Sequence, residues 1–89
     1  MAEERAYLED KLIARLPYAD TGSYNVRDEE VTGFFLRVGK RTKTFLAEGA
    51  YWRDGVREFQ ARVKLGEFGE ITPRAARAKA KTVLGDIAA

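Results

Sequence analysis

The chain has 89 residues, of which 45% are hydrophobic, and its formal net charge is +2. This length and composition predict one small folded domain and exclude a disordered segment. Cysteine and histidine are both absent, which excludes disulfides, thiolate metal sites and the commonest general base. A membrane-spanning helix needs about 18 apolar residues or more. Because the sequence has no such run, no transmembrane helix is expected. The absence of cysteine fits a reducing cytoplasm, and we expect a cytoplasmic protein.

Opposite charges are segregated along the chain. Residues 1–31 carry four basic and eight acidic side chains, a net charge of −4. Residues 32–89 carry twelve basic and six acidic side chains, a net charge of +6. Such segregation is typical of proteins that bind a polyanion, but an ordinary soluble surface can show it as well.

Residues 1–22 are predicted to form a short helix and a turn. Apolar residues at positions 8, 12, 13 and 16 have helical spacing, and Pro17 ends the run. Tyr24–Asp28 alternates between apolar and polar residues and is compatible with a short edge strand. Asp28–Glu30 is expected to be a solvated acidic link.

Three longer runs with the periodicity of strands follow. The first, 34–38, places Phe35 and Arg37 on the face opposite to its other three side chains. The second run covers residues 43–52 and the third covers residues 56–65. Asp54-Gly55 lies between them and favours a tight hairpin turn.

A helix is predicted for residues 72–88. Thr72-Pro73 is typical of a helix start, because threonine caps the first turn and proline lacks the amide hydrogen that would have no partner there. We expect Arg77, one turn into the helix, to pair with Glu67 or Glu70.

The expected fold is α+β, with residues 1–89 forming a single domain. Residues 23–71 are predicted to form an antiparallel sheet of three or four strands, packed on the C-terminal helix. The side chains that the helix is expected to cover are Phe34, Leu36, Val38, Phe45, Val63 and Leu65.

The sheet face turned away from this helix is the candidate functional surface. A β-ribbon fits the major groove of B-DNA, about 12 Å wide, and presents alternate side chains to the base edges. Arginine and lysine pair with guanine, glutamine pairs with adenine, and basic residues in the turns contact phosphates. The candidate DNA-binding residues are Arg37, Lys40, Arg41, Lys43, Trp52, Arg53, Arg57, Gln60, Arg62 and Lys64.

Two alternative interpretations stay open. The basic residues of this face could be solubilising groups paired with Glu48 and Glu58, and either glutamate would repel a phosphate. The sheet edge, or a patch formed by Phe35 and Trp52, could instead dock another protein.

An enzyme is not expected from this chain. It has no glycine-rich phosphate loop, no metal-ligand cluster, and no Ser/His or Cys/His pair. No cofactor is expected.

From about Asp28 onward the sequence resembles the N-terminal arm-type DNA-binding domain of phage and prophage tyrosine recombinases, the integrases. The similarity is carried by Gly33–Val38, Lys43–Phe45, Arg62–Thr72 and Ala76-Arg77, in that order. The resemblance implies a sheet that enters the major groove of arm-type sites in double-stranded DNA. It also implies a role in anchoring an integrase during site-specific integration and excision.

The resemblance has further implications for partners and location. The catalytic residues of that family lie in later domains, so we expect this chain to be one domain of a longer recombinase. Other integrase subunits and accessory DNA-bending proteins are the expected protein partners, and the isolated domain is expected to be monomeric. The resemblance implies a bacterial, nucleoid-associated protein.

Overall fold

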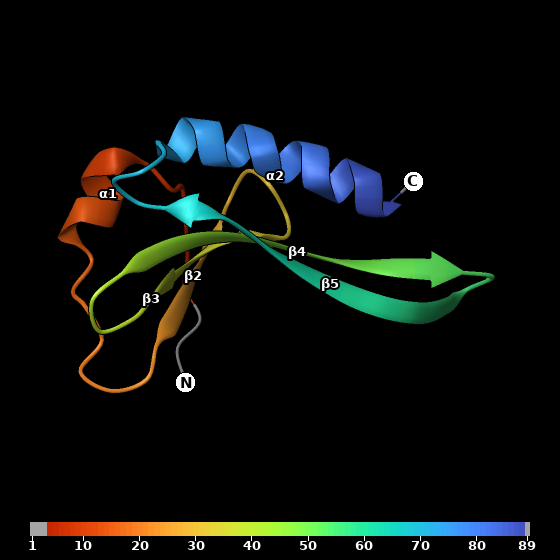
Figure 1. Ribbon diagram of the computed structural model, residues 1–89, viewed down its shortest axis with the longest axis horizontal. Helices are drawn as coiled ribbons and strands as arrows, with labels where there is room; N and C mark the ends of the chain where they lie inside the picture. The colour runs from red at the N-terminus through yellow and green to blue at the C-terminus, as the bar shows by residue number, and fades with distance from the viewer. Residues whose placement is uncertain (1–3, 89) are drawn as a thin grey trace.

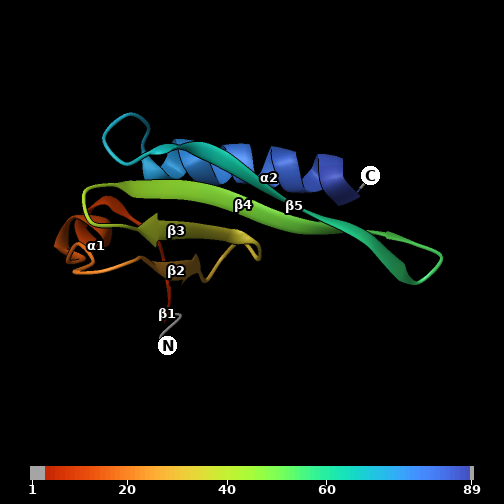
Figure 2. The same ribbon diagram turned by 60° about the horizontal axis from the view of Figure 1, so that its bottom comes forward.

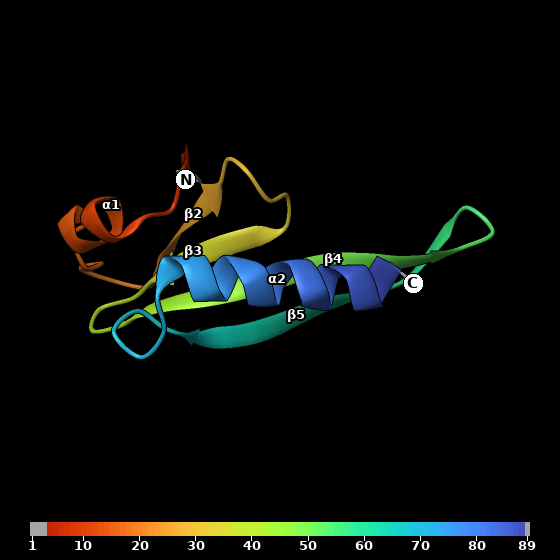
Figure 3. The ribbon, with the colours of Figure 1, turned by 90° about the horizontal axis from the view of Figure 1, so that it is seen from above.

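The computed structural model describes residues 4–88, with backbone only at 51–53, 57–60 and 86–88 (Figure 1). Five strands form one sheet in the order β1-β2-β3-β4-β5. The long second helix lies across one face of this sheet (Figure 3). The elements are β1 (Glu4–Ala6), α1 (Asp10–Arg15), β2 (Tyr24–Asp28), β3 (Phe34–Val38), β4 (Lys43–Arg53), β5 (Val56–Glu67) and α2 (Pro73–Ala88).

Strands β2 to β5 form the antiparallel meander that the sequence predicts, but the sheet is larger and mixed. Strand β1 adds a fifth strand, which runs parallel to β2 with Glu4 opposite Val26. The prediction of three or four antiparallel strands, with only a helix and a turn in 1–22, was therefore wrong in this detail. Three mostly polar residues show too little alternation to indicate a strand, and their partner lies about twenty residues further along the chain.

The hairpin of β4 and β5 is the longest part of the sheet and projects beyond the other strands (Figures 1 and 2). Its turn is Asp54-Gly55, with φ angles of +52° and +78°. Positive φ at both central residues matches the right-handed twist of the flanking strands. The pairing shifts register once between Phe45 and Leu46 and again between Tyr51 and Trp52. Such bulges increase the local twist of a ribbon.

The core lies between the sheet and the two helices. Phe34 and Phe45 stack with their ring centroids 5.9 Å apart, and Ala76 and Ala80 of α2 are fully buried beside them. Small alanines permit this close approach of the helix. Of the side chains expected beneath α2, Val63 differs from the prediction: it is 36% exposed, because β5 is the edge strand.

A second close approach, between the start of β3 and the backbone of β4, occurs at Gly33. Its φ is +95°, and a Cβ there would lie 2.6 Å from the carbonyl oxygen of Glu48. Any other residue would force β3 and β4 apart and strain the backbone.

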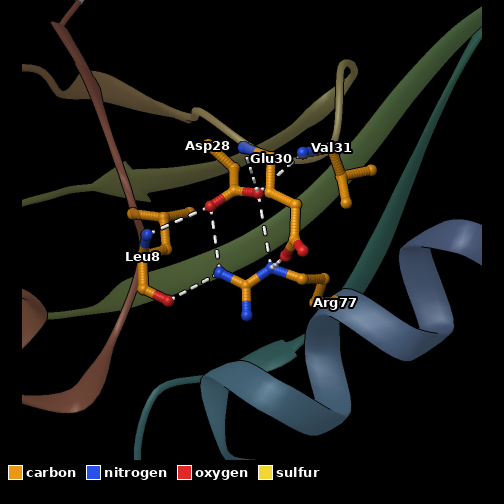
Figure 4. A network of polar contacts seen from close by, with 5 residues as sticks. All are labelled: Leu8, Asp28, Glu30, Val31 and Arg77. Atoms are coloured by element: carbon orange, nitrogen blue, oxygen red, sulfur yellow. Dashed lines mark hydrogen bonds and ion pairs between the residues drawn. The ribbon is translucent and has the colours of Figure 1, made fainter.

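Asp28 and Arg77 form a buried ion pair that fastens α2 to the end of β2 (Figure 4). Asp28 is 1% exposed, so the prediction of a solvated link was wrong at this residue. Arg77 Nη2 donates to Asp28 Oδ1 at 3.0 Å and to the Leu8 carbonyl at 2.8 Å. Arg77 also pairs with Glu30, at 3.1 Å, rather than with the expected Glu67 or Glu70.

Backbone amides complete the hydrogen bonding of the Asp28 carboxylate. The amides of Leu8 and Val31 donate to Asp28 at 3.0 and 2.8 Å. Burial acts to raise the pKa of Asp28, but the hydrogen bonds from Arg77, Leu8 and Val31 outweigh it and hold the pKa below its usual range. The Asp28–Arg77 pair, with Leu8, Glu30 and Val31, is called the buried cluster below.

Candidate nucleic-acid interface

In the described part of the chain, residues 4–88, one face of the sheet is covered by neither helix (Figure 2). It is defined by the side chains that alternate with the core residues of each strand, and is called the open face. Cross-strand pairing brings Asn25, Arg37 and Thr44 into one row, and Arg27, Phe35, Leu46 and Lys64 into the next. Glu48 and Arg62 form a third pair.

The open face has a small apolar centre of its own. Phe35 is fully buried and Leu46 is 6% exposed. The guanidinium carbons of Arg27 and Arg62 lie 5.0 and 5.5 Å from the centroid of the Phe35 ring. These distances are within the range of cation–π attraction. Because the ring lies under two arginines, it offers no exposed aromatic patch with Trp52.

Glu48 links the same two arginines. Arg62 donates to its Oε2 through Nε at 3.1 Å and through Nη2 at 2.5 Å. Arg27 Nη2 reaches its Oε1 at 3.5 Å. The hydrogen bond from Arg62 lowers the pKa of Glu48, burial acts to raise it, and the remaining interactions with Arg62 and Arg27 lower it further. Arg27, Glu48, Arg62 and Phe35 are called the open-face cluster below.

Five of the predicted site residues belong to this cluster or lie on the surface around it. Arg37, Arg62 and Lys64 lie on the open face, where Lys64 also pairs with Glu67 at 3.3 Å. Lys40 and Arg41 are exposed in the turn that joins β3 to β4. The structure thus brings together basic side chains from separate strands, as a groove-binding surface requires.

Lys43 lies elsewhere. It belongs to the core face of β4 and is 6% exposed. Its Nζ donates to the Ile13 carbonyl at the end of α1, at 2.7 Å, and lies 4.8 Å from the centroid of the Tyr18 ring. Burial lowers the pKa of Lys43. A cation in this position caps a helix C-terminus, so we leave Lys43 out of the DNA-binding surface.

The other four predicted site residues lie on the projecting hairpin. The backbone of β4 and β5 places Trp52 opposite Arg57 and Gln60 opposite Ala50, with Arg53 opposite Val56 beside the turn. The side chains of Trp52, Arg53, Arg57 and Gln60 lie outside the described part of the chain.

Sequence analysis missed two residues of the open face, Asn25 and Arg27. Both alternate with the buried Val26, so the strand pattern of 24–28 was the available signal. The Oδ1 of Asn25 is buried without a hydrogen-bond partner in the described structure. Asparagine is a common partner of adenine in DNA complexes.

Metal-ligand groups and membrane-spanning helices were sought among the described residues. No group of three or more acidic, histidine or cysteine side chains is placed to bind a metal ion there. None of the described helices has the length and hydropathy that crossing a membrane requires.

Comparison with known proteins identifies the family of this chain. Neither the curated proteins nor the solved structures include a match to this chain. A family model described as the Arm DNA-binding domain matches residues 8–89, which is nearly the whole chain. The chain therefore belongs to the Arm DNA-binding domain family, found in phage integrases, and is a DNA-binding module of an integrase-type protein.

Proposed function

We propose that this domain binds arm-type sites in double-stranded DNA by inserting the open face of its sheet into the major groove. The observation that carries the proposal is the arrangement of charge. Arginine and lysine side chains from β2, β3 and β5 converge on the face that both helices leave uncovered.

The roles of the basic residues follow from their positions. Arg37, Arg62 and Lys64 lie on strands, where alternate side chains of an inserted ribbon face the base edges. Lys40 and Arg41 lie in a turn at the rim, where a phosphate backbone would pass. The strand residues would supply specificity, and the turn residues would fix the orientation of the domain.

Binding of this kind anchors a larger enzyme. The parent protein would be a tyrosine recombinase whose other domains cut and rejoin DNA during integration and excision. This domain would hold that enzyme to DNA flanking the site of strand exchange, alongside other integrase subunits and DNA-bending proteins.

The test compares two double variants of equal charge change. Arg37→Ala with Lys64→Ala removes two cations from the open face, and Lys79→Ala with Lys81→Ala removes two exposed cations from α2. The ligand is a 20-bp duplex selected in vitro on the full chain. We expect the first variant to lose about tenfold or more in affinity, and the second to lose about threefold or less. Equal losses would contradict the proposal.

A second candidate, a protein-docking module, is favoured by one observation. Strand β5 is a sheet edge, and beside it Val63, Leu65 and Val83 line an apolar groove against α2. Exposed edges of this kind accept an added strand from a partner. Self-association or capture of another integrase subunit without DNA, insensitive to salt, would support this role.

A further inference from the structure

The negative charge of Glu48 on the open face is the feature that simple attraction to DNA does not explain. Glu48 lies between Arg27 and Arg62, and its side chain is 14% exposed, against 45% for Arg62. A carboxylate there reduces the attraction of the face for phosphate. The same carboxylate also forms hydrogen bonds with the two arginines beside it and restricts their orientation.

Glu48 occupies one defined edge of the Arg62 guanidinium. Its Oε2 accepts hydrogen bonds from Nε and Nη2, which together form the side of that group. A guanidinium has five N–H donors. The three that remain belong to Nη1 and Nη2 at the end of the side chain. Such an end-on pair can bind O6 and N7 of guanine together.

Phe35 completes the orientation. Its ring lies 5.5 Å from the Arg62 guanidinium carbon and restricts the arginine from below, while Glu48 restricts it from the side. A side chain already held in its binding rotamer loses less conformational entropy when it binds. An arginine without these contacts would pivot toward the nearest phosphate.

We infer that Glu48 is a positioning residue for DNA specificity, which presents the end-on edge of Arg62 to a guanine in the major groove. This inference rests on the proposed function. Glu48 lowers the affinity for DNA in general, because it repels phosphate, and raises the preference for a site with guanine at the Arg62 position. It touches the arginines and not the base.

The test uses Glu48→Gln, which keeps the shape of the side chain and removes its charge. Affinities are measured for a duplex selected in vitro on the wild-type chain and for a scrambled duplex of the same composition. We expect the variant to bind the scrambled duplex as tightly as wild type or more tightly, while the ratio of the two affinities falls about tenfold.

The matched control is Glu9→Gln, which makes the same charge change at an exposed residue outside the sheet. We expect it to change both affinities by the same factor. If Glu48→Gln also changes both equally, Glu48 acts by repulsion alone and the inference is overturned.

Replacing guanines of the selected duplex by 7-deazaguanine isolates the base contact, because it removes the N7 acceptor. Wild type should lose about tenfold in affinity, and Glu48→Gln should lose little. An equal loss in both proteins would overturn the inference and leave the proposed function intact. If the wild-type chain binds the selected duplex no more tightly than the scrambled duplex, the proposed function fails, and the inference fails with it.

Discussion

The buried cluster and the open-face cluster use the same chemistry on opposite sides of one sheet. Each has a carboxylate that accepts hydrogen bonds from arginine: Asp28 from Arg77, and Glu48 from Arg62. They differ in what surrounds the arginine. Arg77 is 7% exposed and also bonds to the Leu8 carbonyl, whereas the side chain of Arg62 is 45% exposed and keeps donors for a ligand.

The difference shows how burial decides the role of an ion pair. A buried pair costs desolvation and stabilises the fold only if every donor and acceptor is satisfied. The buried cluster meets this condition with backbone groups from two loops (Figure 4). A pair with one solvent-exposed partner, such as Arg62 in the open-face cluster, contributes less to stability, so this cluster can serve binding.

The largest expected effect is on stability. Asp28→Asn would leave the Arg77 charge buried without its main partner and should destabilise the domain by about 3–5 kcal/mol. Urea denaturation measures this loss as a lower midpoint. Glu30→Gln is the control, because Glu30 is half exposed and should cost about 1 kcal/mol or less. A small effect of Asp28→Asn would show that the buried cluster does not fasten α2.

The next effect is on binding. Arg62→Ala should weaken binding to a selected duplex by about 1–3 kcal/mol if Arg62 contacts a base. Its effect on the free energy of unfolding should stay below about 1 kcal/mol. Fluorescence anisotropy and urea denaturation of the same variant give both numbers. A loss of stability larger than the loss of binding would assign Arg62 to the fold instead.

A smaller effect is expected at Lys43, where substitution should change stability and not DNA binding. Lys43→Met removes the hydrogen bond to the Ile13 carbonyl and should cost about 1 kcal/mol of stability. Because Lys43 lies on the core face, DNA affinity and its salt dependence should not change. Lys40→Ala, at the exposed turn, should instead reduce the slope of log affinity against log salt by about 1. A reduced slope in Lys43→Met would return Lys43 to the DNA surface.

The smallest effect concerns pH. The pKa values of Asp28 and Glu48 are lower in the folded chain than their usual values. Each carboxylate therefore contributes stability above its unfolded pKa and loses it as the pH falls through its folded pKa. The free energy of unfolding should decline in acid, and less steeply in Glu48→Gln than in wild type. Identical acid profiles for the two proteins would show that Glu48 gains no stability from the arginines.

Local patterns carried much of the prediction. The strands at 34–38 and 56–65, the Asp54-Gly55 turn and the Thr72-Pro73 helix start were predicted from neighbouring residues, and the structure has a strand, a turn or a helix start at each of these places. Arg37, Arg62 and Lys64 were placed on one face because strand periodicity fixes the side on which each residue lies.

The features that sequence analysis missed depend on distant partners. Asp28 is buried because Leu8 and Arg77, 20 and 49 residues away, bond to it. The buried Lys43 donates a hydrogen bond to the carbonyl of Ile13, 30 residues away. No local pattern carries such pairings. The pairing of Glu48 was foreseen only as an alternative to DNA binding, whereas the geometry makes the two compatible.

The open face, and not α2, is expected to contact DNA. Chemical-shift perturbation of the ¹⁵N-labelled chain by the selected duplex tests it most directly. We expect the largest shifts at the amides of Arg27, Arg37, Leu46, Arg62 and Lys64. Largest shifts along Arg74–Lys81 of α2, with the open face unchanged, would contradict it.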